Sequence, residues 1–545
     1  MKNKYNTCFN PILILICVMF LGCNDDEFIE RSPIDFLAPD NFKTEKDIVH
    51  SVSGIYNAFI SDREEPIKTD FIVDNGYYVG YQEMWKRIYN NETSFIEQKW
   101  SRNYSTILRA NTVLFYIDNV PLSEEKYNQY KGEATFLRAL AYFDLLEFYG
   151  AVPLRTEPES LSQKDKALSS ENDILEFVLA ELETASELLP IIYEPSERGR
   201  ATKGAALAMK ARAYLYHNNY EMAIEYCQKV KGLEIYNLMD NFGSIFLPEN
   251  EAANTETIFD LQFETNEAKR GLSNSWYTRF VFWGGYQISQ NLEEQFYSTN
   301  GLSIDNPSNT LYDESINPGV YNPSTKVKQE NLYDNRFSNR DPRLHATIVV
   351  PYSFYRYKIG GVGNNDDKEI YYPSNQRAAN FSSFKARKYV DYSNNWVQDI
   401  SGVNPIIIRF ADILLMEAEA MVETGTYDEV YVNDLINQVR QRPSVMMPKV
   451  GDVEGLGISQ DAMRQIIRHE RRVEFALEGL RYFDIKRWDI GFEAFKNARG
   501  YEPILLKTNS ATYKVYDFET RTFDPAVGYL WPIPRIETDS NNLIQ

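Results

Sequence analysis

The chain has 545 residues, of which 25% are charged and 14% aromatic, and its formal net charge is −21. Such an acidic chain disfavours nucleic acid as a partner and offers no polybasic patch for a membrane surface. Its length allows a large hydrophobic core, so the fold does not depend on disulfide bonds.

The first 22 residues have the pattern of a secretory signal. Lys2 and Lys4 precede an apolar run over residues 11–21, which is too short to span a bilayer. The run ends in Phe20-Leu21-Gly22-Cys23, which resembles a bacterial lipobox. We therefore expect residues 1–22 to be removed and Cys23 to carry the lipid that anchors the protein. The alternative is a cleaved signal followed by a soluble periplasmic protein.

The residues after Cys23 and the remaining cysteines extend this interpretation. The acidic residues 24–27 resemble a surface-export signal, with a solvated acidic tether as the alternative. Cys8 and Cys17 leave with the signal and Cys23 takes lipid, so Cys227 alone remains in the folded body. No intramolecular disulfide is expected, and the fold must rest on its core.

Apolar residues recur at helical spacing through the first part of the mature chain. The pattern predicts helices over residues 42–60, about 100–114, 127–149 and 172–189. Gly150 and Pro153 follow the third helix and Pro190 follows the fourth, which are typical stop signals.

Two helix pairs come next, and the first resembles a tetratricopeptide repeat. Residues 202–218 and 220–230 form this pair, with Ala211 and Ala223 at the close approach and Tyr214 and Tyr220 filling the space between the helices. Residues 409–424 and 427–440 form the second pair. Such pairs stack because one pair alone cannot bury its apolar face. We expect a helical scaffold over about 40–232 and 406–498, within one domain of residues 23–545.

The segment between these helical parts, residues 233–405, has a different character. Gly, Pro, Asn and Ser interrupt it, aromatic residues crowd it, and its strand-like pieces, such as 256–263, are short. A long irregular stretch inside a compact protein is usually functional. At the far end of the chain, residues 528–534 are extended by their prolines and apolar enough to dock on the body.

Six segments match, in order, the motifs of one known family. They are residues 100–111 (WxxxYxxIxxAN), 339–344 (RDPRL), 410–420 (RYAEVLLMYAEA), 436–440 (INAIRAR), 467–488 (ERRxELxxEGxRxFDxxRW) and 530–534 (LWPIP). Together they span nearly the whole mature chain. On these residues the chain resembles the SusD/RagB family of nutrient-binding outer-membrane lipoproteins.

The resemblance implies a mostly α, SusD-like fold in which TPR-like helix pairs form the scaffold beside an irregular region with short strands. It also implies a lipid-anchored protein of the outer membrane that faces the cell exterior. Such a protein forms a lid over a SusC-like TonB-dependent barrel, binds an oligosaccharide and passes it on without catalysis. Two alternatives stay open: a RagB-like protein that captures peptides, and a structural TPR lipoprotein of the envelope.

The charged signature residues have two interpretations, an active site or a structural network. Arg pairs well with carboxylates because its planar fork matches them, so we predict a charge network that ties helices together. The members are Arg471, Arg472, Glu474, Glu478 and Asp484.

Motifs for catalysis or for a cofactor are incomplete in this sequence. His469-Glu470 begins like a zincin helix, but Val473 stands where the second histidine is required. Residues 360–363 are glycine-rich but lead into acidic residues 364–367 rather than into a helix with a lysine. We expect no enzyme and no cofactor, and the acidic stretch leaves a structural calcium ion as an alternative.

Two aromatic loops, residues 74–85 and 275–287, are the candidate ligand site. A sugar ring offers an apolar face to flat aromatic rings and an edge of hydroxyls to polar side chains. The alternative is that these aromatic rings pack the loops onto the helices. The candidates are Trp276, Trp283 and Tyr286 as stacking platforms, Tyr77, Tyr81 and Trp85 opposite them, and Asn75 and Arg279 as hydrogen-bonding groups.

Overall fold

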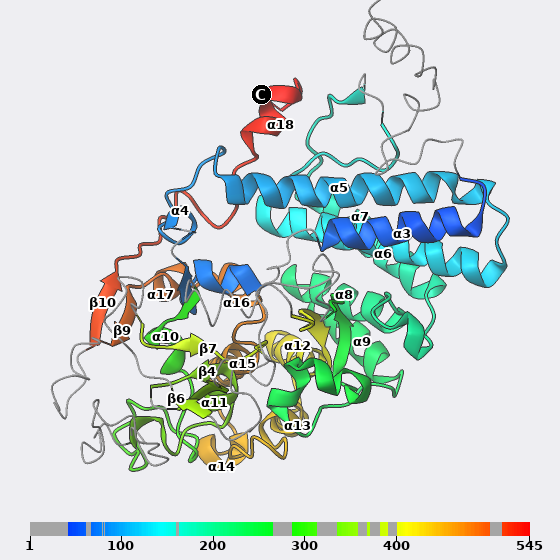
Figure 1. Ribbon diagram of the computed structural model, residues 1–545. Helices are drawn as coiled ribbons and strands as arrows, with labels where there is room; N and C mark the ends of the chain where they lie inside the picture. Colours follow the sequence, from blue (N-terminus) through cyan, green and yellow to red (C-terminus); the bar gives the residue numbers. More distant parts are fainter. Residues whose placement is uncertain are drawn as a thin grey trace, which may run out of the picture.

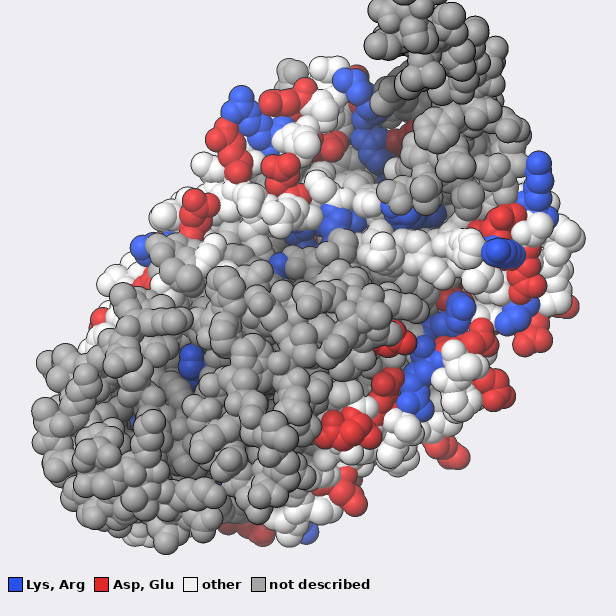
Figure 2. Space-filling view, in the orientation of Figure 1, with Lys and Arg blue, Asp and Glu red and all other residues white. Residues whose placement is uncertain are grey.

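The computed structural model describes residues 42–60, 67–78, 80, 82–159, 163–264, 286–312, 335–351, 353–357, 368–370, 382–390, 401–501 and 515–544. Among these residues, none of the helices combines the length and the hydrophobicity that crossing a lipid bilayer requires. On the face shown in Figure 2, basic and acidic side chains are mixed over the described surface.

Four long helices form the first layer of the scaffold, and α3, α5, α6 and α7 pack in this order, each against the next (Figure 1). Ser123 and Ser170 each accept a hydrogen bond from a backbone N–H of the first turn that follows, which caps α6 and α7. Gly150 ends α6 with a φ of 73°, a conformation that glycine adopts without strain. The bounds are α3 (Glu45–Phe59), α5 (Ser94–Tyr116), α6 (Glu124–Tyr149) and α7 (Glu171–Leu188).

The two predicted helix pairs are present and continue this layer. Helix α7 packs on α8, α8 on α9, α9 on α12, and α12 on α13, so pairs that are far apart in the sequence are neighbours in space. Ala211 and Ala223 are fully buried, and the rings of Tyr214 and Tyr226 lie 5.5 Å apart. The bounds are α8 (Lys203–Tyr216), α9 (Tyr220–Lys231), α12 (Phe410–Glu423) and α13 (Glu429–Arg440).

A second part of the molecule combines two helices of the signature segment with short elements (Figure 1). The turn between α15 and α16 contains Leu477 and Gly479, both at positive φ (66° and 79°). The helices of this part are α4 (Gln82–Trp85), α10 (Gln290–Glu293), α11 (Arg343–Thr347), α14 (Val450–Glu454), α15 (Gln460–Glu474), α16 (Arg481–Arg487) and α17 (Gly491–Ala494). Helix α18 (Arg535–Ser540) lies instead near the start of α5 (Figure 1). The 3-10 helices are η2 (Ile67–Ile72), η4 (Ile117–Asn119), η6 (Pro195–Glu197), η7 (Phe242–Phe246), η8 (Pro248–Ala253) and η12 (Asn335–Phe337).

The strands of the described residues form two-stranded antiparallel ribbons. Some of these ribbons, such as β1–β3 and β2–β8, join strands that are far apart in the sequence. The pairs are β1 (Gly76–Tyr78) with β3 (Tyr286–Ile288), β2 (Thr257–Asp260) with β8 (Ile406–Arg409), β4 (Ile348–Val349) with β7 (Lys385–Ala386), β5 (Phe354–Tyr357) with β6 (Lys368–Ile370), and β9 (Ala498–Tyr501) with β10 (Val515–Glu519). Ribbon β2–β8 confirms the strand predicted near 256–263.

The mostly helical fold predicted from the sequence is confirmed, and so is the docking of the last segment. Trp531 is buried, its backbone N–H donates to the carbonyl of Phe148 (2.7 Å), and the two rings stack at 4.2 Å. Phe148 in turn stacks on Tyr482 of α16 (5.4 Å). The C-terminal segment therefore joins the end of α6 to the signature helices.

Candidate ligand-binding site

Ribbon β1–β3 connects the two aromatic loops that the sequence predicts as the ligand site. Tyr78, the last residue of β1, pairs with Tyr286, the first residue of β3, and Tyr77 pairs with Gln287. Because the strands are antiparallel, the chain that leaves β1 and the chain that enters β3 lie at the same end of the ribbon. Both predicted loops are thus attached at one place, although more than 200 residues separate them.

Three of the predicted ligand residues lie in the described part of the loops, and all three are buried. Asn75, Tyr77 and Tyr286 are 1%, 6% and 1% exposed. The ring of Tyr286 stacks on Tyr78 (4.2 Å), and the ring of Tyr77 meets Phe518 of β10 edge to face (5.5 Å). These side chains therefore make contacts inside the protein and hold ribbon β1–β3 on its core.

The other predicted residues are outside what the structure describes. Trp85 ends α4, but its side chain is not among the described ones. Tyr81, Trp276, Arg279, Trp283, Cys23 and the stretch 360–367 lie outside the described residues. Their roles remain predictions.

Buried carboxylates fasten the segment before β1 to the signature helices. Asp74 pairs with Arg472 (2.8 Å) and Arg481 (3.0 Å). Burial raises the pKa of Asp74, but the two guanidinium groups outweigh it and hold that pKa at about 2. The amide of Asn75 donates to Asp70 (2.6 Å), and the N–H of Gly479 donates to the other oxygen of Asp70.

Asp70 differs from Asp74 in its electrostatic surroundings. Burial raises the pKa of Asp70 to about 6, and the hydrogen bonds from Asn75 and Gly479 offset only part of that rise. Asp70 therefore sits close to its titration range at neutral pH, while Asp74 stays ionised. Together they link the first predicted loop to the turn between α15 and α16.

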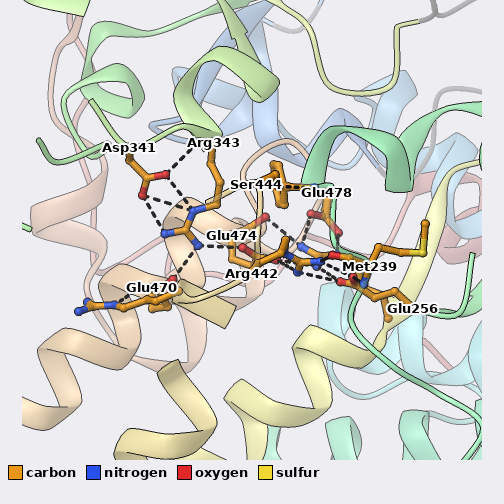
Figure 3. A network of polar contacts seen from close by, with 12 residues as sticks. Met239, Glu256, Asp341, Arg343, Arg442, Ser444, Glu470, Glu474 and Glu478 are labelled. Carbon is orange, nitrogen blue, oxygen red and sulfur yellow. Dashed lines mark hydrogen bonds and ion pairs between the residues drawn. The ribbon is translucent and has the colours of Figure 1, made fainter. Parts of the chain in front are cut away.

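A larger network of buried charges lies behind these contacts, centred on Glu474 (Figure 3). Arg409 reaches Glu256 (2.6 Å), Glu474 (2.8 Å) and Glu478 (2.8 Å). Arg442 bridges Glu256 (2.6 Å) and Glu474 (3.0 Å). Burial opposes the ionisation of Glu474, yet the neighbouring arginines hold its pKa far below the ordinary value.

The same carboxylate also ties in the RDPRL loop. Arg343 contacts Asp341 (2.8 Å), Glu470 (2.6 Å) and Glu474 (2.8 Å), and all four side chains are at most 2% exposed. One side of α15 is thereby joined to the loop, to β2, to β8 and to the end of α13.

A second network joins α15 and α16 to the scaffold. Arg471 pairs with Asp412 of α12 (2.7 Å), and Asp412 also holds Arg212 of α8 (2.6 Å). Arg487 of α16 pairs with Glu419 of α12 (2.5 Å). The predicted structural role of Arg471, Arg472, Glu474, Glu478 and Asp484 is confirmed, since each one forms buried ion pairs between elements.

Sequence reasoning missed several members of these networks, among them Glu256, Arg409, Arg442 and Asp412. A usable signal was present, because Arg409 ends the apolar run 406–408 and Asp412 lies within the apolar helix 410–420. Charged residues in such runs are rarely buried unless they are paired. The partners come from distant segments, which no local pattern indicates.

The histidine of the broken zincin motif is a buried structural residue. His469 lies against the ring of Tyr297 (3.8 Å between centroids), and its Nε2 is 2.7 Å from the carbonyl of Gln295. Burial lowers the pKa of His469 to about 4, so the ring is neutral and donates this hydrogen bond. Within the described ranges, no group of three or more His, Cys, Asp or Glu side chains is arranged to hold a metal ion.

Comparison with known proteins gives consistent matches over the whole chain. A family model described as "SusD family" matches residues 255–545, and one described as "Starch-binding associating with outer membrane" matches residues 27–215. SusD-like protein P2 of Formosa agariphila is 27% identical over 565 aligned positions, which cover 99% of this chain and 98% of that protein.

Two solved structures from Bacteroides fragilis have the same fold. A SusD-like protein has a TM-score of 0.77 and 27% identity, covering 94% of this chain and 99% of that chain. A SusD-like carbohydrate binding protein has a TM-score of 0.76 and 25% identity, covering 92% of this chain and 99% of that chain.

Proposed function

Because the chain belongs to the SusD family, we propose that it captures a glycan and delivers it to a SusC-like TonB-dependent transporter of the outer membrane. The family match spans more than half of the chain, residues 255–545. The ligand class is supported by the starch-binding description of the second matching family and by the carbohydrate-binding relative from Bacteroides fragilis. The same description names an association with the outer membrane.

The observation that carries the proposal for the site is ribbon β1–β3, which attaches both aromatic loops at one end. We assign stacking on the sugar rings to Trp276, Trp283, Tyr81 and Trp85, and hydrogen bonding to Arg279. The loops are positioned by three buried side chains at their attachment, Asn75, Tyr77 and Tyr286. A rigid support of this kind lowers the entropy that loops lose when a ligand binds.

The protein acts by binding alone in this proposal. The carboxylates of the signature segment form ion pairs with arginines. Glu474, for example, pairs with three of them: Arg343, Arg409 and Arg442. A carboxylate held in this way is a weak base and has no proton to give, so it is poorly suited to general acid–base chemistry.

The mode of attachment follows from the N-terminal sequence. We propose that residues 1–22 are a signal peptide, that Cys23 is lipidated, and that residues 23–545 form one SusD-like domain on the cell exterior. Several acyl chains make such an anchor effectively permanent. The anchor also raises the local concentration of the binding protein at its SusC-like partner, which favours a weak lid contact.

The test begins with a glycan array probed with residues 24–545, followed by titration calorimetry with the best ligand. Trp276→Ala combined with Trp283→Ala should weaken binding at least about 100-fold, because buried aromatic anchors dominate such interfaces. The melting temperature should stay close to that of the parent protein. Phe115→Ala is the matched control, since this ring on α5 is 54% exposed and belongs neither to ribbon β1–β3 nor to its loops.

Unchanged affinity of the double variant would refute the assignment of the two tryptophans. An array that responds to peptides and to no glycan would replace the ligand class with the RagB-like one.

A further inference from the structure

A cavity of about 850 Å³ lies at the end of the scaffold where α6 begins, and none of its lining residues belongs to ribbon β1–β3. The start of α6, the segment between α7 and α8, and strand β2 form its walls. Gln129 lines the cavity, whereas Phe148, 19 residues later on α6, contacts Trp531 and Tyr482. At 1.5 Å per residue these two points of α6 are about 28 Å apart.

The volume of the cavity falls in the range of small-molecule sites. Its wall is also fixed before any ligand arrives. Arg200 pairs with both oxygens of Glu133 (3.0 Å each), and the N–H of Ala201 donates to the hydroxyl of Tyr56 (2.9 Å). The N–H of Lys203 donates to the carbonyl of Pro190 (2.9 Å), which closes the loop at its base. A wall held at three points loses little entropy on binding.

Gly199 shows how tightly this wall is built. Its φ is +86°, and a Cβ at this position would lie 2.1 Å from Cγ of Gln262. Only glycine satisfies both conditions. The loop between α7 and α8 therefore packs directly on the residues that follow β2, and it keeps the cavity open beside them.

Several polar groups of the wall have hydrogen-bonding capacity to spare. The hydroxyl oxygens of Tyr193 and Thr257 are buried in the wall and have no hydrogen-bond partner among the described residues. The carboxylate of Asp260 accepts a hydrogen bond from Nε2 of Gln262 (2.9 Å), which leaves it further acceptor sites. Burial raises the pKa of Asp260 to about 6, so it is mostly ionised at neutral pH.

Apolar and aromatic surface is exposed next to these polar groups. Ile191 and Ile192 are 45% and 73% exposed, and both belong to the lining, as do the rings of Tyr193 and Tyr236. Exposed isoleucines beside tyrosine rings give a surface that suits the C–H face of a sugar.

The charges of the lining disfavour an anionic ligand. Five acidic residues and three basic ones line the cavity, and two of the basic ones, Lys126 and Arg200, already pair with Glu197 (3.8 and 3.4 Å). The remaining carboxylates suit a neutral molecule that donates hydrogen bonds.

We propose that this cavity is a second carbohydrate site, which takes a neutral saccharide. The apolar face of the sugar lies against Tyr193, Tyr236 and Ile192, and its hydroxyls donate to Asp260. The inference goes beyond the proposed function, because it uses none of the residues of the loops on ribbon β1–β3. A polysaccharide held at two distant sites dissociates more slowly than one held at either site alone.

The experiment uses saturation-transfer NMR with four neutral disaccharides: maltose, cellobiose, lactose and xylobiose. Four forms of residues 24–545 are compared. They are the parent, Trp276→Ala/Trp283→Ala, this pair combined with Tyr193→Ala and Asp260→Asn, and the same pair combined with Asp260→Asn alone. Asp434→Asn, at an exposed position of α13, is the matched control for the change at Asp260.

The second site predicts a signal in the double tryptophan variant that falls roughly tenfold when Tyr193 and Asp260 are also changed. The variant with Asp260→Asn alone guards against misfolding and should reduce the same signal, because the amide lacks the charge that attracts the sugar hydroxyls. Loss of all signal in the double tryptophan variant overturns the second site and leaves the proposed loop site intact. Equal signals in the parent and that variant, lost on changing the cavity, support the second site and contradict the loop site. A parent protein without any signal contradicts both.

Discussion

The scaffold and the loop-bearing part of this molecule are held together in different ways. In the scaffold, α3, α5 to α9, α12 and α13 bury apolar and alanine-rich faces, and most neighbours in space are also neighbours in the sequence. In the loop-bearing part, segments more than 150 residues apart meet through buried ion pairs, such as Asp74 with Arg481 and Arg409 with Glu256.

The difference has a physical consequence. Apolar contacts are not directional, so a scaffold of this kind can adjust when one side chain changes. A buried charge depends on a particular partner, and removing that partner leaves the charge without compensation. The ligand loops thus rest on the part of the protein that tolerates the least change.

The largest expected effect comes from breaking the network at Arg409. Arg409→Met keeps an unbranched apolar stem but leaves Glu256, Glu474 and Glu478 without their shared cation. We expect a loss of about 3–5 kcal/mol in the free energy of unfolding, measured by guanidinium denaturation. Arg535→Met is the control. The side chain of Arg535 is 59% exposed although it forms ion pairs, so this substitution should leave the denaturation midpoint unchanged. Equal midpoints for the two variants would contradict the comparison.

A pH titration distinguishes the two buried aspartates of the first loop. The folded pKa of Asp70 is about 6, above its ordinary value of 3.8, so the native state binds this proton more tightly than the unfolded state. The stabilisation is complete below pH 4 and is lost as the pH rises towards 6. A shift of about two units corresponds to roughly 3 kcal/mol. Asp70→Asn should lack this component in denaturation curves recorded from pH 4 to 7.

For Asp74, the dependence of the folding stability on pH has the opposite sign. Its folded pKa of about 2 lies below the ordinary 3.8, so its stabilisation is present above pH 4 and is lost on acidification towards pH 2. Asp74→Asn should therefore be less stable than the parent at pH 6, and this deficit should shrink on acidification. Identical pH profiles of the two variants would show that the surroundings of Asp70 and Asp74 do not differ as described.

The smallest effect is expected in the scaffold. Ala211→Leu adds volume where α8 and α9 approach and should cost about 1–3 kcal/mol, since the helices can shift slightly to accommodate it. Ala180→Leu is the control at an exposed position of α7 and should change stability by less than about 0.5 kcal/mol. Thermal denaturation of both variants gives the comparison. A loss in Ala211→Leu as large as in Arg409→Met would remove the contrast between the two parts.

The sequence predicts the scaffold well, for a reason visible in its helices. The helix predicted at 127–149 is α6 (Glu124–Tyr149), and the one at 172–189 is α7 (Glu171–Leu188). Periodic apolar residues, capping serines and Gly150 act locally, so each helix is encoded within its own segment.

The candidate site is less predictable, because its geometry depends on distant pairings. The sequence gives Tyr77 and Tyr81 the same predicted role as ligand-binding residues. In the structure, Tyr77 belongs to β1, which pairs with β3, and its side chain is buried. The signature residues are recognisable as a charge network, but Glu256 joins it from a segment without a matched motif. Arg442 stands at the last arginine of the INAIRAR motif, which does not indicate its carboxylate partners. Local patterns contain no information on which distant carboxylate meets which arginine.

The ion pair between Asp74 and Arg481 has a consequence for the order of events after synthesis. The two residues are 407 positions apart, and ribosomes release the N-terminal one first. Asp74 therefore stays hydrated and without its arginine partners while most of the polypeptide is still being synthesised. A product that stops before residue 472 lacks both arginines that pair with Asp74, Arg472 and Arg481, and cannot fasten the first loop through them. Premature termination therefore yields a chain whose early helices can form but whose ligand loop stays unattached, a defect that a protease specific for loose segments can detect.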